Sequence, residues 1–294
     1  MMRIQDLYTP DRLVVSFELF PPKNDAGMDT LMKSVEKLAE HRPEFFTCTY
    51  GAGGSTRQRT LEVATAVRDR TGLPVASHLT CVGSTREQLR EYLQAAQSRG
   101  IDYIVALRGD PPRGQATFNA VAGGLRYANE LVAMIREEFP NFGIFVAGYP
   151  EVHQEAPNAA VDLQNLVRKV EAGADAVLTQ LFYCNEDYFR FRDACEQAGI
   201  TVPIVPGLLP VLSLNQVQRI TSLCKAKLPA PLLERLSAHE QPDWQFNVGV
   251  EHAIAQTEEL VAQGVPGFHF YVLNRSDAID RIVAAIPQLA SRVN

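Results

Sequence analysis

Short runs of β-branched and aromatic residues recur along the chain, and amphipathic segments separate them. Each run has the length of a strand, whereas the segments between them repeat apolar residues at helical spacing. The eight runs lie at 13–20, 45–50, 74–80, 101–107, 142–149, 174–182, 202–205 and 266–273. Strands that alternate with helices in this way predict an α/β fold, a (βα)8 TIM barrel that forms a single domain over residues 1–294.

The segments between the runs carry helix signals of their own. In the stretch 158–173, apolar residues fall at i, i+3, i+4 and i+7 from Leu163, and Gly173 can end the helix in the left-handed conformation. Similar patterns cover 28–41, 56–71, 85–99, 123–138, 185–198 and 213–226. An open, doubly wound sheet is the main alternative fold. It would normally carry a G-x-G-x-x-G turn after its first strand, and this sequence has none.

Residues 227–247 do not follow the alternation. This stretch, KLPAPLLERLSAHEQPDWQFN, contains three prolines and the only tryptophan of the chain. We interpret it as an irregular insertion before the last barrel helix and strand, and Trp244 and Phe246 suggest an interface or a lid. We expect a homo-oligomer whose copy number the sequence does not give.

Composition and charge narrow the class of partner. The formal net charge of −6 comes without a basic block, so a nucleic-acid or anionic-membrane partner is not expected. The N-terminal residues lack an apolar signal segment, and no run approaches the ~20 apolar residues of a membrane span. The five cysteines are widely spaced without a C-x-x-C pair, which disfavours a disulfide framework or a zinc cage. We therefore expect a cytoplasmic, thiol-reduced protein that acts on small molecules.

The predicted barrel also predicts where the chemistry lies. Active sites in this fold occupy the C-terminal ends of the strands and the loops that follow them. Every predicted strand except the seventh brings polar side chains to that end, in the stretches FELF, TCTYGAGGS, SHLT, ALRGD, AGYPEVH, TQLFY and FYVLNR. We expect these stretches to meet at one rim of the barrel.

Glu18 is the most informative of these polar residues, because it lies inside an apolar run. Strand alternation directs Glu18 into the barrel mouth, whereas its neighbours Phe17 and Leu19 face the helices. A structural ion pair with Arg108 or Arg275 would explain it. Catalysis is the favoured interpretation, because burial keeps a carboxyl group protonated near neutral pH, as a proton donor requires.

Polar residues of the next strands have two interpretations each. Arg108 and Asp110 bracket a glycine, as a simple turn would, but Asp110 would also converge with Glu18 on one mouth. The stretch YGAGGST could bind a phosphate through its backbone, with Ser55 or Thr56 as helix cap, or form a tight turn. His78, taken alone, is more often a core histidine than a catalyst.

Three further groups lie on the later strands and on the helix after the fifth. Tyr149, Glu151 and His153 could form a metal half-site or a polar loop, and we expect no metal because no partner motif supports it. Residues 162, 165 and 169 share one helix stripe, which is either an exposed face or a set of anion and ribose contacts. Gln180 lies in an apolar run, where an amide could bind the edge of a heterocycle or serve structure.

Eight ordered motifs in this chain resemble those of one enzyme family. They are VSFELFPPK, TYGAGGSTRQRT, SHLTCVGSTREQL, GIDYIVALRGDPP, AGYPEVHQEA, DLQNLVRKVEAGADAVLTQLFY, PGLLPV and GFHFYVLNR. From about residue 13 to 285 the chain is similar to methylenetetrahydrofolate reductases of the bacterial, single-domain type. The resemblance implies a (βα)8 barrel that binds FAD without a Rossmann domain. It also implies a flavoprotein oxidoreductase of one-carbon metabolism and methionine biosynthesis.

The activity implied by the resemblance is a ping-pong reaction at one FAD. NADH or NADPH reduces the flavin and leaves, and 5,10-methylenetetrahydrofolate then takes its place and is reduced to 5-methyltetrahydrofolate. The sequence does not distinguish the two nicotinamides, and NADH is the expectation from family tendency. Alternatives of other classes are a barrel lyase or aldolase, with Lys169 as a Schiff-base amine, and a non-catalytic folate-binding partner subunit.

The resemblance also assigns residues by matching position. Glu18 would be the acid that helps to open the five-membered ring of the folate, and Asp110 would tune the flavin and favour the cationic iminium. The substrate contacts implied are Glu18, Gln180, Leu214, Tyr271 and Arg275, although Leu214 stands where some members have a stacking phenylalanine. The cofactor contacts implied are Thr49, Tyr50, His78, Leu107, Arg108, Gly109, Asp110, Tyr127, Ala128, Ala147, Tyr149, His153, Asp162, Asn165 and Lys169.

Overall fold

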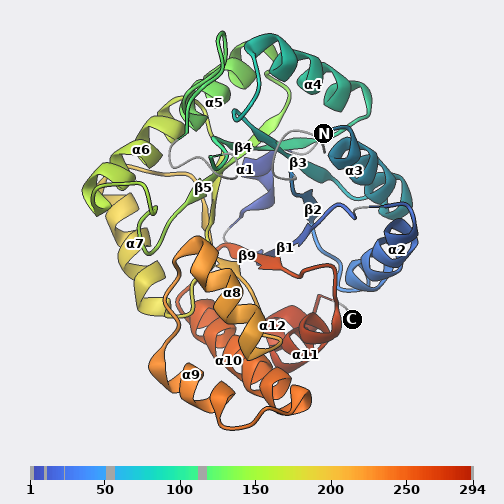
Figure 1. Cartoon of the computed structure of the whole chain (residues 1–294), viewed down its shortest axis with the longest axis vertical. Helices are drawn as coiled ribbons and strands as arrows, with labels where there is room; N and C mark the ends of the chain where they lie inside the picture. The colour runs from blue at the N-terminus through green and yellow to red at the C-terminus, as the bar shows by residue number, and fades with distance from the viewer. Residues whose placement is uncertain (1–2, 10–11, 23, 51–56, 112–117, 293–294) are drawn as a thin grey trace.

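The strands form a barrel of parallel strands with helices outside it (Figure 1). The computed structural model describes residues 3–9, 12–22, 24–50, 57–111 and 118–292. Within these residues the strands are β1 (Val14–Leu19), β2 (Phe45–Cys48), β3 (Val75–Thr80), β4 (Tyr103–Leu107), β5 (Gly143–Gly148), β6 (Ala176–Thr179), β7 (Ile204–Val205), β8 (Gly207–Leu208) and β9 (Gly267–Tyr271). Their order around the sheet is β7-β6-β5-β4-β3-β2-β1-β9-β8, which confirms the predicted barrel class.

The predicted seventh strand, 202–205, is replaced by two short strands. β7 pairs with β6 and β8 pairs with β9, while Pro206 lies between them. Proline has no N–H for the ladder, so one continuous strand cannot form here. The ring still closes, because the backbone N–H of His269 donates to the carbonyl of Pro206 at 3.0 Å. Gly207 allows the close approach, since a Cβ there would lie 2.2 Å from the carbonyl oxygen of Thr179.

The predicted helices are present within a few residues of their expected bounds. They are α2 (Ala26–Ala39), α3 (Arg57–Thr71), α4 (Arg86–Ser98), α5 (Ala128–Glu138), α6 (Ala159–Glu171), α7 (Asn185–Gln197) and α8 (Leu214–Cys224). The helix expected before the last strand is α10 (Pro242–Ala262), which begins inside the stretch predicted to be irregular. Side-chain caps start several of them: Thr85 forms a capping box with Gln88, and Asn158 and Ser213 accept from backbone N–H groups. Helix α11 (Asp277–Ala285) follows β9.

The segment 227–247 is more regular than the sequence predicts. It contains helix α9 (Ala230–Ser237) and the first residues of α10. Its prolines occupy the first turns of these helices, where a missing N–H costs no hydrogen bond. Prolines that suggested irregular structure therefore mark two helix starts.

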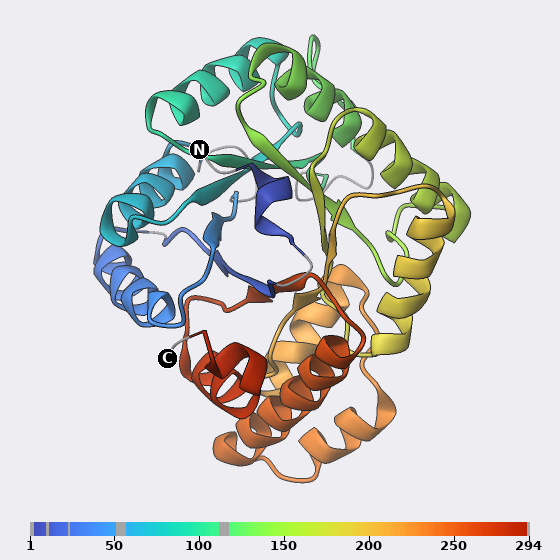
Figure 2. The same ribbon diagram turned by 180° about the vertical axis from the view of Figure 1, so that it is seen from behind.

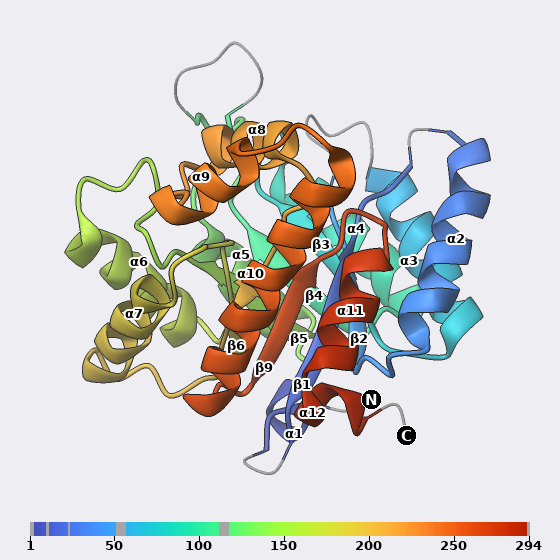
Figure 3. The ribbon, with the colours of Figure 1, turned by 90° about the horizontal axis from the view of Figure 1, so that it is seen from below.

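A short N-terminal helix closes the bottom of the barrel. Helix α1 (Ile4–Leu7) lies at the N-terminal ends of the strands, opposite α8 (Figures 2 and 3). Ile4 and Leu7 are buried in one cluster with Val14, Phe45 and other residues of the barrel interior. The chain ends near the same face with α12 (Pro287–Ala290). The interior is thus filled from below, and the space for a ligand lies at the other end.

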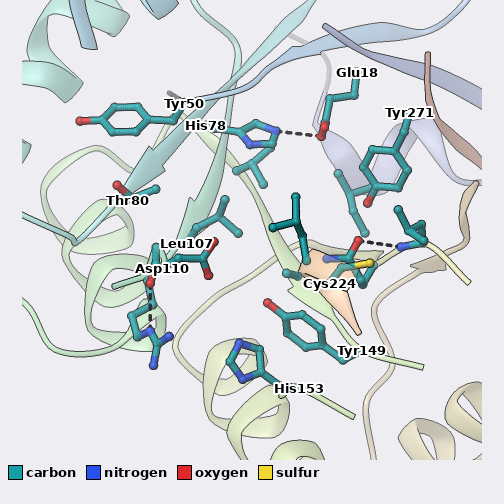
Figure 4. Close-up of a pocket in the computed structure, with 18 of the residues that line it drawn as sticks. Glu18, Tyr50, His78, Thr80, Leu107, Asp110, Tyr149, His153, Cys224 and Tyr271 are labelled. Carbon is teal, nitrogen blue, oxygen red and sulfur yellow. Dashed lines mark hydrogen bonds and ion pairs between the residues drawn. The ribbon is translucent and has the colours of Figure 1, made fainter. Parts of the chain in front are cut away.

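The faces of the first strand agree with the predicted alternation. Val14 belongs to the interior cluster, whereas Val15, Phe17 and Leu19 pack in the larger cluster between strands and helices. Glu18 therefore projects into the barrel from β1 (Figure 4). None of the helices that the structure describes is both long and apolar enough to cross a membrane.

Candidate active site

A cavity of about 860 Å³ lies at the C-terminal ends of the strands (Figure 4). Residues at the ends of β1, β3, β4, β5, β6 and β9 line it, and side chains of α8 cover one side. Its lower wall is apolar, with Val105, Leu107 and Leu178, whereas the polar residues stand at the strand ends. A cavity of this size and mixed lining is typical of a small-molecule site.

Glu18 faces two histidines inside this cavity. Its Oε2 lies 3.4 Å from Nε2 of His78 and 3.5 Å from Nε2 of His269. The carboxyl group belongs to a residue that is only 7% exposed. Burial lowers the pKa of His78, and this effect outweighs the attraction of Glu18. His78 is therefore expected to be a neutral neighbour of the Glu18 carboxyl group at neutral pH.

Ser16 determines which nitrogen of His269 carries the proton. Ser16 and His269 are both fully buried, and Ser16 Oγ lies 2.8 Å from Nδ1 of His269. The hydroxyl donates to the carbonyl of Phe268 at 3.3 Å, so its oxygen accepts the hydrogen bond from Nδ1–H. In the neutral ring, Nε2 is then bare and can accept a proton from Glu18. The arrangement therefore offers an acceptor, inside the cavity, to a proton carried by Glu18.

Arg108 donates to partners within the protein from each of its three nitrogens. Its Nη1 and Nη2 donate to the two carboxylate oxygens of Glu155 at 2.7 and 2.6 Å, and its Nε donates to the carbonyl of Gly109. The guanidinium also lies over the ring of Phe118, 5.2 Å from its centroid. The bidentate bond raises the pKa of Arg108 and lowers that of Glu155. Arg108 thus ties the loop after β4 to the loop after β5.

His153 is held as a neutral donor in the loop after β5. The backbone N–H of Glu155 donates to its Nδ1 at 3.1 Å, so the proton of the neutral ring resides on Nε2. Its own backbone N–H donates to Asp162 Oδ2 at 2.9 Å. Burial, followed by the nearby charge of Arg108, lowers the pKa of His153. A hydrogen bond is therefore the interaction that His153 offers to a ligand.

Lys169 lies behind the cavity wall. Its Nζ donates to the carbonyl of Ala147, a lining residue, and lies 5.9 Å from the ring centroid of Tyr149. Burial lowers its pKa to about 8, against the opposing effect of Asp162. The ammonium is still charged at neutral pH and can attract an anion.

Gln180 and Tyr271 complete the wall between β6 and β9. The Oε1 of Gln180 accepts from the N–H of Leu181 at 2.9 Å, which directs its amide NH2 group to other partners. The hydroxyl of Tyr271 donates to the carbonyl of Thr179 at 2.6 Å. Burial, and then the charge of Glu18, raises the pKa of Tyr271 well above its usual value. Tyr271 is therefore a rigid wall residue and not an acid.

The sequence of the chain matches one protein family, methylenetetrahydrofolate reductase, over residues 3–287. The chain belongs to this family. It is 40% identical over 264 residues to the 5,10-methylenetetrahydrofolate reductase of Escherichia coli strain K12, covering 90% of this chain and 87% of the relative. A probable methylenetetrahydrofolate reductase (NADH) of Oryza sativa is 39% identical over 285 residues, covering 92% of this chain. The chain spans about half, 48%, of the length of that rice relative.

A solved structure shares the fold at low sequence identity. It is an uncharacterized protein from Clostridium thermocellum that binds two copies of 5-methyl-5,6,7,8-tetrahydrofolic acid. The TM-score is 0.66 at 14% identity, and the match covers 95% of each chain. This likeness concerns the barrel fold alone.

Most of the residues that the sequence suggested for this reductase-family site do line the cavity. They are Glu18, Tyr50, His78, Leu107, Arg108, Gly109, Asp110, Ala147, Tyr149, His153, Gln180 and Tyr271. Asp162 and Lys169 lie behind this lining and contact it through hydrogen bonds to His153 and Ala147. Thr49 is buried next to Tyr50, and its carbonyl accepts from Thr60. The glycine-rich stretch after Tyr50, with Ser55 and Thr56, lies outside the described residues.

Five other suggested residues lie away from the cavity. Tyr127 is 54% exposed, and Ala128 begins α5 beside it. Asn165 bonds Arg168 on the outside of α6. Leu214 packs among α8, α9 and α10 residues, and its N–H donates to Gln245. Arg275 is exposed and pairs with Asp277.

The sequence reasoning overlooked two residues of the site. His269 lies in an apolar run, two positions before Tyr271, so the rule that singled out Glu18 would have found it. Thr80 ends β3 and lines the cavity, and its buried Oγ1 has no hydrogen-bond partner among the described residues. Threonine is common at strand ends, so nothing in the sequence marks Thr80 as a site residue.

A flavin nucleotide fits the residues that are present. Nε2 of His78 and Oγ1 of Thr80 are buried polar atoms of the lining without a hydrogen-bond partner in the described part of the chain. His153 offers a donor, Lys169 a positive charge, and the apolar wall a surface for a ring. No three metal-binding side chains come together in the portion of the chain that is described.

Proposed function

We propose that this protein is a flavin-dependent methylenetetrahydrofolate reductase that uses NADH or NADPH to reduce 5,10-methylenetetrahydrofolate to 5-methyltetrahydrofolate. Membership of the family supports the reaction. The observation that carries the proposal is the buried Glu18, placed against a bare histidine nitrogen in a cavity large enough for two ring systems. The names of plant relatives specify NADH, which supports NADH as the donor here.

The residues present would hold the cofactor at the polar strand ends. His78, Thr80 and His153 offer hydrogen-bonding atoms, and Lys169 supplies charge for a phosphate. When bound, FAD supplies the two-electron chemistry that takes hydride from the nicotinamide and passes it to the folate. One cavity serves both half-reactions, so donor and folate bind in turn, as a ping-pong scheme requires.

Glu18 provides the proton for the folate half-reaction. Reduction requires the five-membered ring of the folate to open to a cationic iminium, and protonation of a ring nitrogen drives that opening. The proton is held on Oε2 of Glu18 and shared with Nε2 of His269, 3.5 Å away. Glu18 is only 7% exposed, so little solvent reaches this proton and bound substrate is its nearest acceptor outside the protein.

Asp110 and Gln180 orient and stabilise the folate. Asp110 lines the cavity at the end of β4 and places a negative charge near the developing iminium. Gln180 presents its amide NH2 to an acceptor on the pterin, because its oxygen is already bonded to Leu181.

The visible spectrum of the purified protein tests the proposal. We expect flavin absorbance that is bleached by NADH under anaerobic conditions and restored by 5,10-methylenetetrahydrofolate with formation of 5-methyltetrahydrofolate. Folate binding without flavin or turnover would instead favour a non-catalytic subunit. Trapping of a carbonyl substrate on Lys169 by borohydride would favour a lyase. Either result would overturn the proposal.

A further inference from the structure

Two adjacent residues at the end of β9 have left-handed backbone conformations. Leu273 has a φ of 48° and Asn274 a φ of 59°. Asparagine tolerates this conformation because its side chain can bond locally, whereas a leucine there is strained. Leu273 lines the cavity. A strained apolar residue at the edge of a ligand cavity requires a restraint, and it suggests a functional reason for the strain.

The side chain of Asn274 supplies that restraint. Its Oδ1 accepts from the backbone N–H of Phe20 at 2.9 Å, and its Nδ2 donates to the backbone carbonyl of Phe20 at 2.8 Å. β1 and β9 pair up to Glu18 and Tyr271, and Pro21 then removes the next N–H from the ladder. The amide of Asn274 therefore continues the pairing by one residue where the backbone cannot.

The residues held in this way form one side of an apolar rim. Phe20 lines the cavity and is 37% exposed, and Leu273 lines it from the turn that follows β9. On α8, Leu223 lines the same cavity and is 68% exposed. Large apolar side chains that remain exposed around a cavity favour a ligand with an apolar ring. Glu18 lies two residues before Phe20, at the level where the polar end of that ligand would react.

The neighbouring Arg275 does not share this role. It is exposed, and its guanidinium donates to Asp277 at 3.0 Å, away from the cavity lining. Within the stretch LNR, the side-chain amide of Asn274 thus bonds to the cavity residue Phe20, whereas the guanidinium of Arg275 pairs at the surface.

We propose that Asn274 is a positioning residue whose amide fixes Phe20 and Leu273 as an apolar clamp for the benzoyl ring of the folate substrate. The proposal rests on the proposed function, because that function supplies the ligand. Nicotinamide nucleotides lack the benzoyl ring, so we expect folate binding to depend on this clamp more than NADH binding does. Loss of the Asn274 side-chain amide is therefore expected to lower the affinity for folate and to leave the rate of hydride transfer from NADH unchanged.

Three substitutions separate the hydrogen bonds from the backbone strain. Asn274→Ala removes both bonds, Asn274→Gly removes both while it tolerates the positive φ, and Asn274→Asp keeps the bond from the Phe20 N–H alone. Asn247→Ala is the matched control, since it removes one exposed side-chain bond, to Arg281. We expect the Kd for 5-methyltetrahydrofolate, measured by calorimetry on the FAD-loaded protein, to rise about 5- to 30-fold in the Ala and Gly variants. The Kd of the Asn274→Asp variant should lie between those of the Ala and Gly variants and that of the wild type.

Two further measurements distinguish positioning from general damage. Flavin reduction by NADH is expected to stay within about twofold of wild type, and hydrogen exchange at Phe20 to become faster in the Ala variant. Wild-type folate affinity in the Ala and Gly variants would overturn the role of Asn274, as would equal losses with both substrates. If the wild-type protein itself neither binds nor reduces folate, the proposed function fails as well.

Discussion

The substitution Ser16→Ala tests the proton arrangement at Glu18. Ser16 lies outside the cavity lining, and its Oγ accepts from Nδ1–H of His269 in a fully buried pair. Alanine leaves that N–H without a partner. The neutral ring can avoid this cost by moving its proton to Nε2, which then donates to Glu18 and no longer accepts a hydrogen bond from it.

The size of the effect follows from the burial of the pair. An unpaired buried donor costs about 1–3 kcal/mol. Because 1.4 kcal/mol corresponds to a factor of ten, the balance between the two ring forms shifts by about 5- to 150-fold. We expect the folate half-reaction to slow within this range.

Stopped-flow absorbance of the flavin separates the two half-reactions. Reduction by NADH needs no proton from Glu18 and should stay near the wild-type rate, whereas reoxidation by 5,10-methylenetetrahydrofolate should slow. Ser77→Ala is the control, because Ser77 is an equally buried strand serine bonded to Tyr92 on the helix side. Equal slowing of both half-reactions, or the same effect in Ser77→Ala, would refute the reasoning.

Two further predictions concern charge and packing. Lys169 loses its charge above its pKa of about 8, so the affinity of the apoprotein for FAD should be constant below pH 8 and fall above it. Quenching of flavin fluorescence on binding measures this affinity. The variant Lys169→Met should show no such fall. Gly249→Ala should be strongly destabilising, because a Cβ there would lie 1.9 Å from the carbonyl oxygen of Val211. A cost of about 3 kcal/mol corresponds to a Tm lower by roughly 5 °C, and an unchanged calorimetric Tm would contradict this packing argument.

Local periodicity accounts for the part of the structure that the sequence predicts well. A strand has a side-chain period of two, so one apolar run was enough to place Glu18 inside the barrel and Phe17 outside it. His269 obeys the same rule on the last strand, where its place in an apolar run marks it as clearly as Glu18 is marked on the first. The break at Pro206 has an equally local cause, since a proline interrupts any ladder, but the short strand β8 beyond it was not predicted from the sequence.

Local periodicity does not predict contacts between loops that are far apart in the sequence. Arg108 and Glu155 are 47 residues apart, and Asn274 and Phe20 are 254 apart. Neither pair carries a local pattern, because each depends on where two strand ends meet in the closed ring. The sequence indicated Arg108 as a cofactor ligand, while in the structure its nitrogens donate to Glu155 and Gly109. Helix α1, which closes the bottom of the barrel, has only four residues, too few for a helical repeat of apolar positions to be recognised in the sequence.

The most direct test of the account is the substitution Glu18→Gln, measured in both half-reactions. Glutamine keeps the size of the side chain but has no acidic proton, and general acid catalysis contributes typically about 10²- to 10⁴-fold. We expect NADH to reduce the flavin at close to the wild-type rate, and the reaction of the reduced enzyme with 5,10-methylenetetrahydrofolate to slow by at least about 100-fold. A variant that still reduces folate at the wild-type rate, or that loses both half-reactions equally, would contradict the claim that Glu18 delivers the proton.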